Sequence, residues 1–130
     1  MTHRLVVVVD DCPQAASTLE IALGSMAGVE VAVASTVPAA LEILRNRAEG
    51  SVAALLTDLD LPRMDGFDLI EKVRSDPRYV RLPIIVISGS TDPDVPARSM
   101  RLGASAYFAK PYSPGEVRNQ LERLLHANPI

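Results

Sequence analysis

Three aspartates come directly after apolar stretches of the chain, and their carboxylates suit the binding of a cation. Asp10 and Asp11 follow Leu5–Val9, and Asp58 follows Val52–Thr57. Two unit charges about 4 Å apart repel by ~4 kcal/mol at an effective dielectric constant of about 20, so carboxylates brought together need a positive partner. The sequence offers oxygen ligands, because the two histidines lie near the chain ends and the single cysteine stands alone. This donor set favours Mg²⁺ over zinc.

A hydroxyl and an ammonium group end two further apolar stretches, and both suit the binding of a phosphoryl group. Ser88 precedes Gly89, whose missing side chain leaves room for a tetrahedral group. Lys110 is one of two lysines among the 13 basic residues, and the proline after it favours an extended backbone at this position. Taken singly, each residue is typical of a solvated turn, so the hypothesis depends on all five side chains meeting at one place.

Apolar stretches alternate with helical patterns five times, and this order predicts where the polar side chains lie. Strands are predicted at Leu5–Val9, Val29–Val33, Val52–Thr57, Leu82–Ile87 and Ala106–Ala109. The alternation predicts an α/β fold, a single doubly wound (βα)5 domain with helices on both faces of a five-stranded parallel sheet. The strands of such a sheet end at one edge, where α/β proteins bind ligands. The stretch from 29 to 33 mixes small and charged residues with valine, so we expect it at a border of the sheet.

Proline, glycine and capping residues predict where the helices begin and end. The predicted starts are Pro13, an apolar stripe from Val37, a cap at Asp65, Pro93, and a capping box at Ser113–Glu116. The second helix is expected to continue through Ala48 and to stop at Gly50, and the fourth to stop at Gly103. In the first helix the predicted apolar face is Ala15, Leu19, Ala22, Leu23 and Met26.

Length and composition limit the class of protein. With 130 residues, the chain is expected to form one domain (1–130) and to carry no output domain. A net charge of -3 and 4% aromatic residues provide neither the basic surface nor the stacking groups that bind nucleic acid. No apolar stretch approaches the ~20 residues of a membrane-spanning helix, so no membrane contact is expected. The single cysteine fits a reducing compartment, and we expect a cytoplasmic location.

Four motifs, in order along the chain, resemble the response regulator receiver domain of two-component signalling. They are the pair Asp10-Asp11, the segment Leu56–Gly66 around Asp58, Ser88-Gly89 thirty residues beyond Asp58, and the segment Gly103–Pro111. The resemblance covers nearly the whole chain. It implies the sheet order 2-1-3-4-5, which a chemotaxis member of this family has.

The resemblance implies that Asp58 is the phosphoacceptor, with Lys110 and Ser88 as its catalytic partners. Asp58 would take a phosphoryl group from a phosphohistidine on a histidine kinase or a histidine phosphotransfer protein. Lys110 would pair with Asp58 and then with a phosphoryl oxygen, while the Ser88 hydroxyl donates a hydrogen bond to another oxygen. Ser88 stands where threonine is commoner in the family, which keeps the hydroxyl but loses the stiffness of a branched side chain.

The resemblance also implies the metal ligands and a conformational switch. Mg²⁺ would be held by Asp11, Asp58 and the backbone carbonyl of Asp60, with Asp10 acting through water. Tyr107 would be the aromatic switch residue, and the face formed by the fourth helix, fifth strand and fifth helix would change shape. The chain is then a signalling switch, a monomer or a weak phosphorylation-dependent dimer, and not an enzyme with a separate substrate.

Three other hypotheses fit parts of the sequence. A phosphorylation-independent interaction module of the same fold usually lacks one of the site residues, and this chain keeps them all. The segment Asp58-Leu59-Asp60 also resembles the active site of haloacid-dehalogenase-type phosphatases, which carry it after the first strand of a longer chain. A flavodoxin-like FMN protein needs glycine and hydroxyl residues where this chain has Asp10–Pro13.

Overall fold

The central strands are continuous apolar runs because helices cover both faces of the sheet. β1 (Arg4–Val9), β3 (Val52–Asp58) and β4 (Ile84–Ser88) are buried along almost their whole length. β2 (Val29–Ala34) and β5 (Ala106–Ala109) are only partly buried and form the two borders. All pairs are parallel, and the order is β2-β1-β3-β4-β5. The predicted fold class, sheet order and border position of the second strand are confirmed.

The structure is a computed structural model that describes residues 4–48, 50–61 and 66–127. The predicted cap at Asp65 lies outside these residues. None of the helices in the described ranges is both long enough and apolar enough to cross a membrane.

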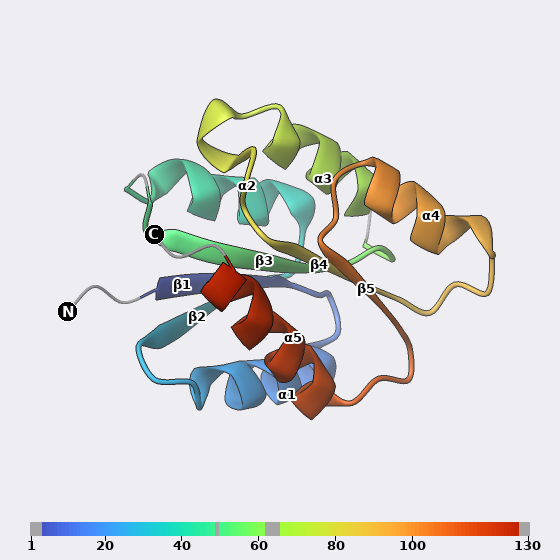
Figure 1. Ribbon diagram of the computed structural model, residues 1–130, viewed down its shortest axis with the longest axis horizontal. Helices are drawn as coiled ribbons and strands as arrows, with labels where there is room; N and C mark the ends of the chain where they lie inside the picture. Colours follow the sequence, from blue (N-terminus) through green and yellow to red (C-terminus); the bar gives the residue numbers. More distant parts are fainter. Residues whose placement is uncertain (1–3, 49, 62–65, 128–130) are drawn as a thin grey trace.

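Helices form one layer on each face of the sheet (Figure 1). α1 (Pro13–Gly24) and α5 (Pro114–Ala127) cover one face, and α2 (Val37–Asn46), α3 (Gly66–Arg74) and α4 (Asp94–Arg101) cover the other. Each crossover therefore carries the chain over the sheet and returns it to the same starting edge. As a result, the carboxyl ends of all five strands meet at one edge of the molecule.

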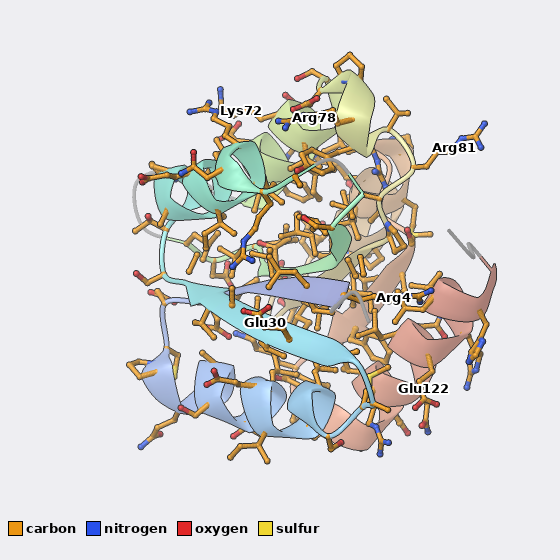
Figure 2. The ribbon with its side chains drawn as sticks, turned by 90° about the vertical axis from the view of Figure 1, so that its left-hand side faces the viewer. Arg4, Glu30, Lys72, Arg78, Arg81 and Glu122 are labelled. Atoms are coloured by element: carbon orange, nitrogen blue, oxygen red, sulfur yellow. The ribbon has the colours of Figure 1, made fainter. Side chains whose placement is uncertain are left out.

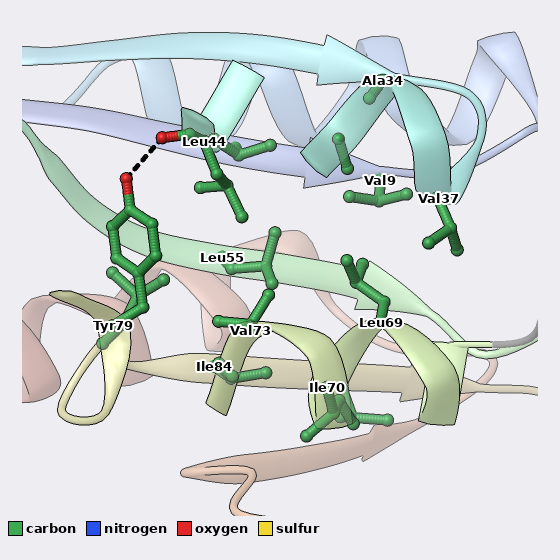
Figure 3. Packing of buried hydrophobic residues seen from close by; sticks show 14 of the residues in the cluster. Val9, Ala34, Val37, Leu44, Leu55, Leu69, Ile70, Val73, Tyr79 and Ile84 are labelled. Atoms are coloured by element: carbon green, nitrogen blue, oxygen red, sulfur yellow. Dashed lines mark hydrogen bonds between the residues drawn. The ribbon is translucent and has the colours of Figure 1, made fainter. Parts of the chain in front are cut away.

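Alternate residues of the buried strands enter two separate apolar cores. Val6 and Val8 of β1 pack with residues of α1 and α5, while Val7 and Val9 pack with residues of α2 and α3. Figure 3 shows the second of these cores, where Leu55 and Ile84 of the sheet meet side chains of the covering helices. Because both faces of β1 are buried, its sequence is apolar at every position and does not alternate.

The end of α2 differs from the prediction. The helix ends at Asn46, Arg47 is extended with φ -95° and ψ 148°, and Ala48 is exposed. A tertiary contact lies at this end: the buried Tyr79 hydroxyl donates a hydrogen bond of 2.6 Å to the carbonyl oxygen of Leu44 (Figure 3). This bond satisfies a carbonyl in the last turn of α2 that has no intrahelical partner. Gly50, with φ 83°, therefore does not end the helix and lies in the loop before β3.

The fourth strand begins later than predicted. It starts at Ile84, whereas Leu82 belongs to a turn in which its N–H donates to the carbonyl oxygen of Tyr79 (3.2 Å). This turn follows a short 3₁₀ helix, η1 (Pro77–Tyr79), that the sequence analysis did not predict. Pro83 has no N–H to donate, which separates the turn from the regular strand.

The predicted starts of α1, α4 and α5 and the predicted end of α4 agree with the structure. α4 starts directly after Pro93, and Gly103, with φ 113°, follows its end. In α5 the Glu116 N–H points at the Ser113 hydroxyl oxygen at 3.4 Å, a long form of the predicted cap. In α1 the predicted apolar face lacked Ala16, which is buried. Its buried side chains are Ala16, Leu19 and Leu23, while Ala15 and Ala22 are half-buried and Met26 is buried beyond the helix.

Candidate functional site

Three carboxylates meet at the carboxyl edge because β1 and β3 are neighbours in register. Val9 pairs with Thr57, so Asp10, next in the chain after β1, lies beside Asp58, the last residue of β3. Carboxylate oxygens of Asp10, Asp11 and Asp58 all lie within 4.8 Å of one another. Asp10 and Asp58 are only 4% and 3% exposed, and Asp11 is exposed. The convergence that the sequence predicted is therefore present.

Burial raises the pKa of Asp10 above its usual value. The hydrogen bond from the Cys12 N–H to Oδ1 (2.9 Å) opposes this shift, and the negative charge of Asp58 adds to it. The carboxyl group of Asp10 therefore holds a proton more tightly than a solvated aspartate does. A cation placed among the three carboxylates relieves the repulsion that causes part of this shift.

Asp58 is held in one orientation by two donors, one on each oxygen. The Lys110 ammonium donates to Oδ2 at 2.5 Å, and the Asp60 N–H donates to Oδ1 at 2.9 Å. The first contact was predicted; the second was not, because it depends on how the chain turns after β3. Asp60 itself is exposed. Whether its backbone carbonyl takes part in metal binding stays a prediction.

Lys110 reaches the site from the end of β5. Its backbone N–H donates to the carbonyl oxygen of Ser88 (2.8 Å), and the peptide bond to Pro111 is cis, which the sequence analysis did not predict. Partial burial works against the charged ammonium, but the hydrogen bond to Asp58 and the charges of Asp58 and Asp10 outweigh it and raise the pKa of Lys110. The ammonium therefore stays protonated at neutral pH.

Ser88 and Gly89 lie at the same edge, between the strands that carry Asp58 and Lys110. Ser88 is the last residue of β4 and is fully buried, and its hydroxyl oxygen accepts a hydrogen bond from the Ser90 N–H (3.0 Å). A side chain on Gly89 would lie 3.7 Å from the aliphatic stem of Lys110, so glycine leaves that stem uncovered. The structure places both residues where the sequence predicted.

Gly66 contributes a structural requirement that the sequence analysis missed. A Cβ atom at this position would lie 2.6 Å from the backbone carbonyl oxygen of Asp58 and 2.8 Å from the Cα of Leu59. The Gly66 N–H also donates to the carbonyl oxygen of Leu59 (3.1 Å). The start of α3 therefore packs directly on the backbone of the central aspartate, and only glycine allows this approach. In the sequence, Gly66 is marked only by its position at the end of the segment Leu56–Gly66, which does not reveal why glycine is needed there.

Two tyrosines lie close to this edge. Tyr107 is half-buried on the border strand β5, pairs with Val86 of β4, and packs on the α2–α3 side of the core. Tyr112 was not singled out from the sequence. Burial, followed by the negative charge of Asp10, raises the pKa of Tyr112. The switch role of Tyr107 stays a prediction.

The donor set fits a hard divalent cation. Three carboxylates converge, two of them buried, and the Cys12 side chain beside them is exposed. Oxygen ligands with one side open to water are typical of Mg²⁺ sites. The ammonium of Lys110 offsets only one of the three negative charges, so the described site has room for further positive charge.

The fold and this edge together define the flavodoxin-like class of α/β proteins, in the form that carries an acidic cluster and a lysine at the ends of β1, β3 and β5. The sequence profile of the response regulator receiver domain matches residues 6–122. The chain belongs to the response regulator receiver domain family. This result sets aside the phosphatase and FMN-protein hypotheses.

Sequence similarity to individual proteins supports the same family. The chain is 35% identical over 81 residues to chemotaxis protein CheY1 of Helicobacter pylori, which is 62% of this chain and 65% of CheY1. It is 34% identical over 124 residues to the transcriptional regulatory protein KdpE of Mycobacterium tuberculosis, which is 95% of this chain and 52% of KdpE. The chain thus spans less than two thirds of these curated relatives.

Solved structures confirm the fold. A putative response regulator from Chloroflexus aurantiacus superposes with a TM-score of 0.82 at 32% identity, covering 95% of this chain and 98% of that one. CheY4 of Vibrio cholerae superposes with a TM-score of 0.83 at 27% identity, covering 95% of this chain and 100% of that one.

Replacement of Asp60 by asparagine is expected to weaken Mg²⁺ binding slightly and to lengthen the life of a phosphorylated state. Its backbone N–H donates to Asp58, and its negative charge contributes to the raised pKa of Lys110. Because Asp60 is exposed, the loss in binding free energy should be on the order of 1 kcal/mol or less. A magnesium titration followed by NMR and a phosphate-release time course measure the two effects. Glu20→Gln on α1, which removes an equally exposed charge, is the matched control; identical behaviour of the two variants would make Asp60 a bystander.

Proposed function

We propose that the chain is a phosphoacceptor receiver of a two-component or phosphorelay system, with Asp58 as the phosphorylated residue. The observation that carries this proposal is the setting of Asp58. It is a buried carboxylate with an ammonium on one oxygen, a backbone N–H on the other, and two more carboxylates within 4.8 Å. Membership of the receiver family supports the same function.

In the proposed reaction, a carboxylate oxygen of Asp58 attacks the phosphorus of a phosphohistidine on the partner. The new P–O bond forms as the P–N bond breaks, and its electron pair returns to the imidazole, which takes up a proton. Lys110 keeps its proton because of its raised pKa, and its charge offsets the negative charge of the phosphoryl oxygens. The buried Ser88 hydroxyl, one strand away, donates a hydrogen bond to one of those oxygens.

Mg²⁺ is the cofactor in this proposal. Asp10, Asp11 and Asp58 would hold it, together with the backbone carbonyl of Asp60, and Asp10 would act through water. The ion would supply positive charge that offsets the negative charge of the transferred group. The convergence of the three carboxylates within 4.8 Å supports this assignment, since their repulsion when ionised calls for a cation.

The proposal also covers partners and setting. A histidine kinase or histidine phosphotransfer protein supplies the phosphoryl group, in the cytoplasm, and nucleic acid and membranes are not contacted directly. The chain is a switch and not an enzyme with a separate substrate, because its chemistry is the gain and loss of a phosphoryl group on its own aspartate. It works as a monomer or a weak dimer that depends on phosphorylation.

Transfer from a phosphohistidine tests this function. Autophosphorylated histidine kinases carrying radiolabelled phosphate, and phosphoramidate as a small donor, are mixed with the protein and Mg²⁺. We expect label to move to Asp58 from at least one kinase and phosphate to be taken from phosphoramidate. Failure with every kinase and with the small donor would leave the phosphorylation-independent module as the better hypothesis.

Occupation of the site is expected to shift the face formed by α4, β5 and α5, where Tyr107 lies. Support comes from the weak anchoring of α4. Its one buried residue is Ser99, and the Arg98 guanidinium lies over the Phe67 ring of α3, 4.1 Å from the ring centre. To change the ratio of two conformations from 1:99 to 99:1, a ligand must bind one of them ~5.5 kcal/mol more strongly than the other, so we expect the shift to be partial. Amide chemical shifts with Mg²⁺ and beryllofluoride, a mimic of the bound phosphoryl group, measure it. Shifts confined to the aspartate loops would contradict the switch.

A further inference from the structure

A groove of about 250 Å³ lies on the helical layer opposite α1 and α5, far from the aspartates. It separates α2 from the last turn of α3 and from η1, at the amino ends of the strands. Its walls include Leu41, Arg45, Lys72, Ser75, Asp76 and Tyr79. We call it the α2–η1 groove, and none of its residues takes part in the proposed phosphoryl chemistry.

The groove is positively charged although the whole chain carries -3. Arg45 and Lys72, in the last turns of α2 and α3, line it, and neither forms an ion pair with a carboxylate in the described part of the chain. Figure 2 shows Lys72 and Arg78 on the same side of the molecule. Val80, 55% exposed, and Arg81 continue the chain after η1.

The carboxylate of Asp76, the acidic residue that lines the groove, is already paired with Arg78. Its carboxylate accepts hydrogen bonds from the Arg78 side chain at Oδ2 (2.9 Å) and Oδ1 (3.3 Å), and from the Arg78 N–H (3.0 Å). These bonds, followed by the charge of Arg45, lower the pKa of Asp76. Arg78 therefore balances Asp76, and the exposed side chains of Arg45 and Lys72 carry the positive excess of the groove.

We infer that the α2–η1 groove is a docking site for an acidic peptide segment of a partner protein. Carboxylates of the segment pair with Arg45 and Lys72, and an aliphatic side chain lies against the half-buried Leu41. The chemistry favours a peptide over nucleic acid, because the Tyr79 ring is 4% exposed and offers no stacking surface. Since the groove lies at the opposite end of the strands from Asp58, docking does not depend on the state of that residue.

Selection from a random library of displayed peptides tests this inference with the full chain. Selected peptides are expected to be rich in Asp and Glu around one aliphatic residue. Chemical shift changes on adding one such synthetic peptide should centre on the groove residues. The variant Arg45→Gln/Lys72→Gln is expected to bind at least tenfold more weakly, and added salt should weaken binding to the wild type.

Controls separate the groove from general attraction to a basic surface. Arg101→Gln/Arg123→Gln removes two charges from other helices and should retain wild-type affinity. Asp58→Asn should bind the peptide as the wild type does, so failure of the proposed phosphorylation leaves this result intact. Three results would overturn the inference: selected peptides without acidic enrichment, equal losses in both double variants, or tighter groove-dependent binding of a single-stranded oligonucleotide than of the peptide.

Discussion

Replacement of Asp58 by asparagine is expected to abolish the uptake of phosphate from acetyl phosphate while the fold is retained. An amide has nearly the shape of a carboxylate but is a much weaker nucleophile, so incorporation should fall by ~100-fold or more. The side chain is buried at the end of β3, and no other carboxylate in the described site has the Lys110 ammonium bonded to it. Intact mass spectrometry after incubation with Mg²⁺ and acetyl phosphate measures incorporation directly.

Two controls make this result specific. Asp60→Asn removes an acid two residues away and should keep incorporation, because its exposed side chain is not the nucleophile. Wild-type protein in EDTA should lose incorporation, since three carboxylates and one ammonium leave the site negative without a divalent cation. Equal incorporation in Asp58→Asn, or full incorporation in EDTA, would contradict the assignment. Circular dichroism of each variant checks that the fold is unchanged.

Replacement of Arg74 by methionine is expected to lower the free energy of unfolding by ~2–4 kcal/mol. The guanidinium joins three segments: Nε and Nη2 donate to the Gly103 carbonyl oxygen (3.2 and 2.7 Å), and Nη1 donates to that of Tyr79 (2.7 Å). Burial lowers the pKa of Arg74, so its charge depends on these carbonyls for compensation. Methionine keeps the stem and leaves both carbonyls without this donor.

Urea unfolding of the variant measures the loss, with Arg101→Met as the matched control. Arg101 ends α4 and is exposed, so its replacement should change the free energy of unfolding by less than ~0.5 kcal/mol. Equal free energies of unfolding for the two variants would show that the three hydrogen bonds of Arg74 stabilise the fold no more than hydration of the same groups does. The replacement of Arg74 also removes the donors that hold the Gly103 carbonyl oxygen, in the loop between α4 and β5.

The site could be predicted from sequence because its position follows from local patterns. A strand buried on both faces is apolar at every residue, so the run ending at Val9 and the run ending at Thr57 each mark a strand end. Parallel strands place Asp10 and Asp58 at the same edge, and the sheet order implied by the family resemblance makes their two strands neighbours. The position of Lys110 could be predicted in the same way, because it directly follows the last strand.

What could not be predicted depends on contacts between distant residues or on loop geometry. α2 ends at Asn46, where the Tyr79 hydroxyl from 35 residues away meets the Leu44 carbonyl, and no local signal reports that bond. The Asp60 N–H reaches Asp58 only through the turn that follows β3. Gly66 was visible in a motif, but its reason, the approach to the Asp58 backbone, exists only in three dimensions.

The open border of the sheet has a consequence for self-assembly. β2 pairs only with β1 among the described strands, so its outer backbone groups are free to pair with an extended segment of another molecule. Glu30 lies on this strand (Figure 2), is exposed, and is 3.9 Å from the Arg47 guanidinium. A second copy aligned along β2 would bring two such glutamates near each other. That repulsion disfavours edge-to-edge pairing through the valine-rich strand β2.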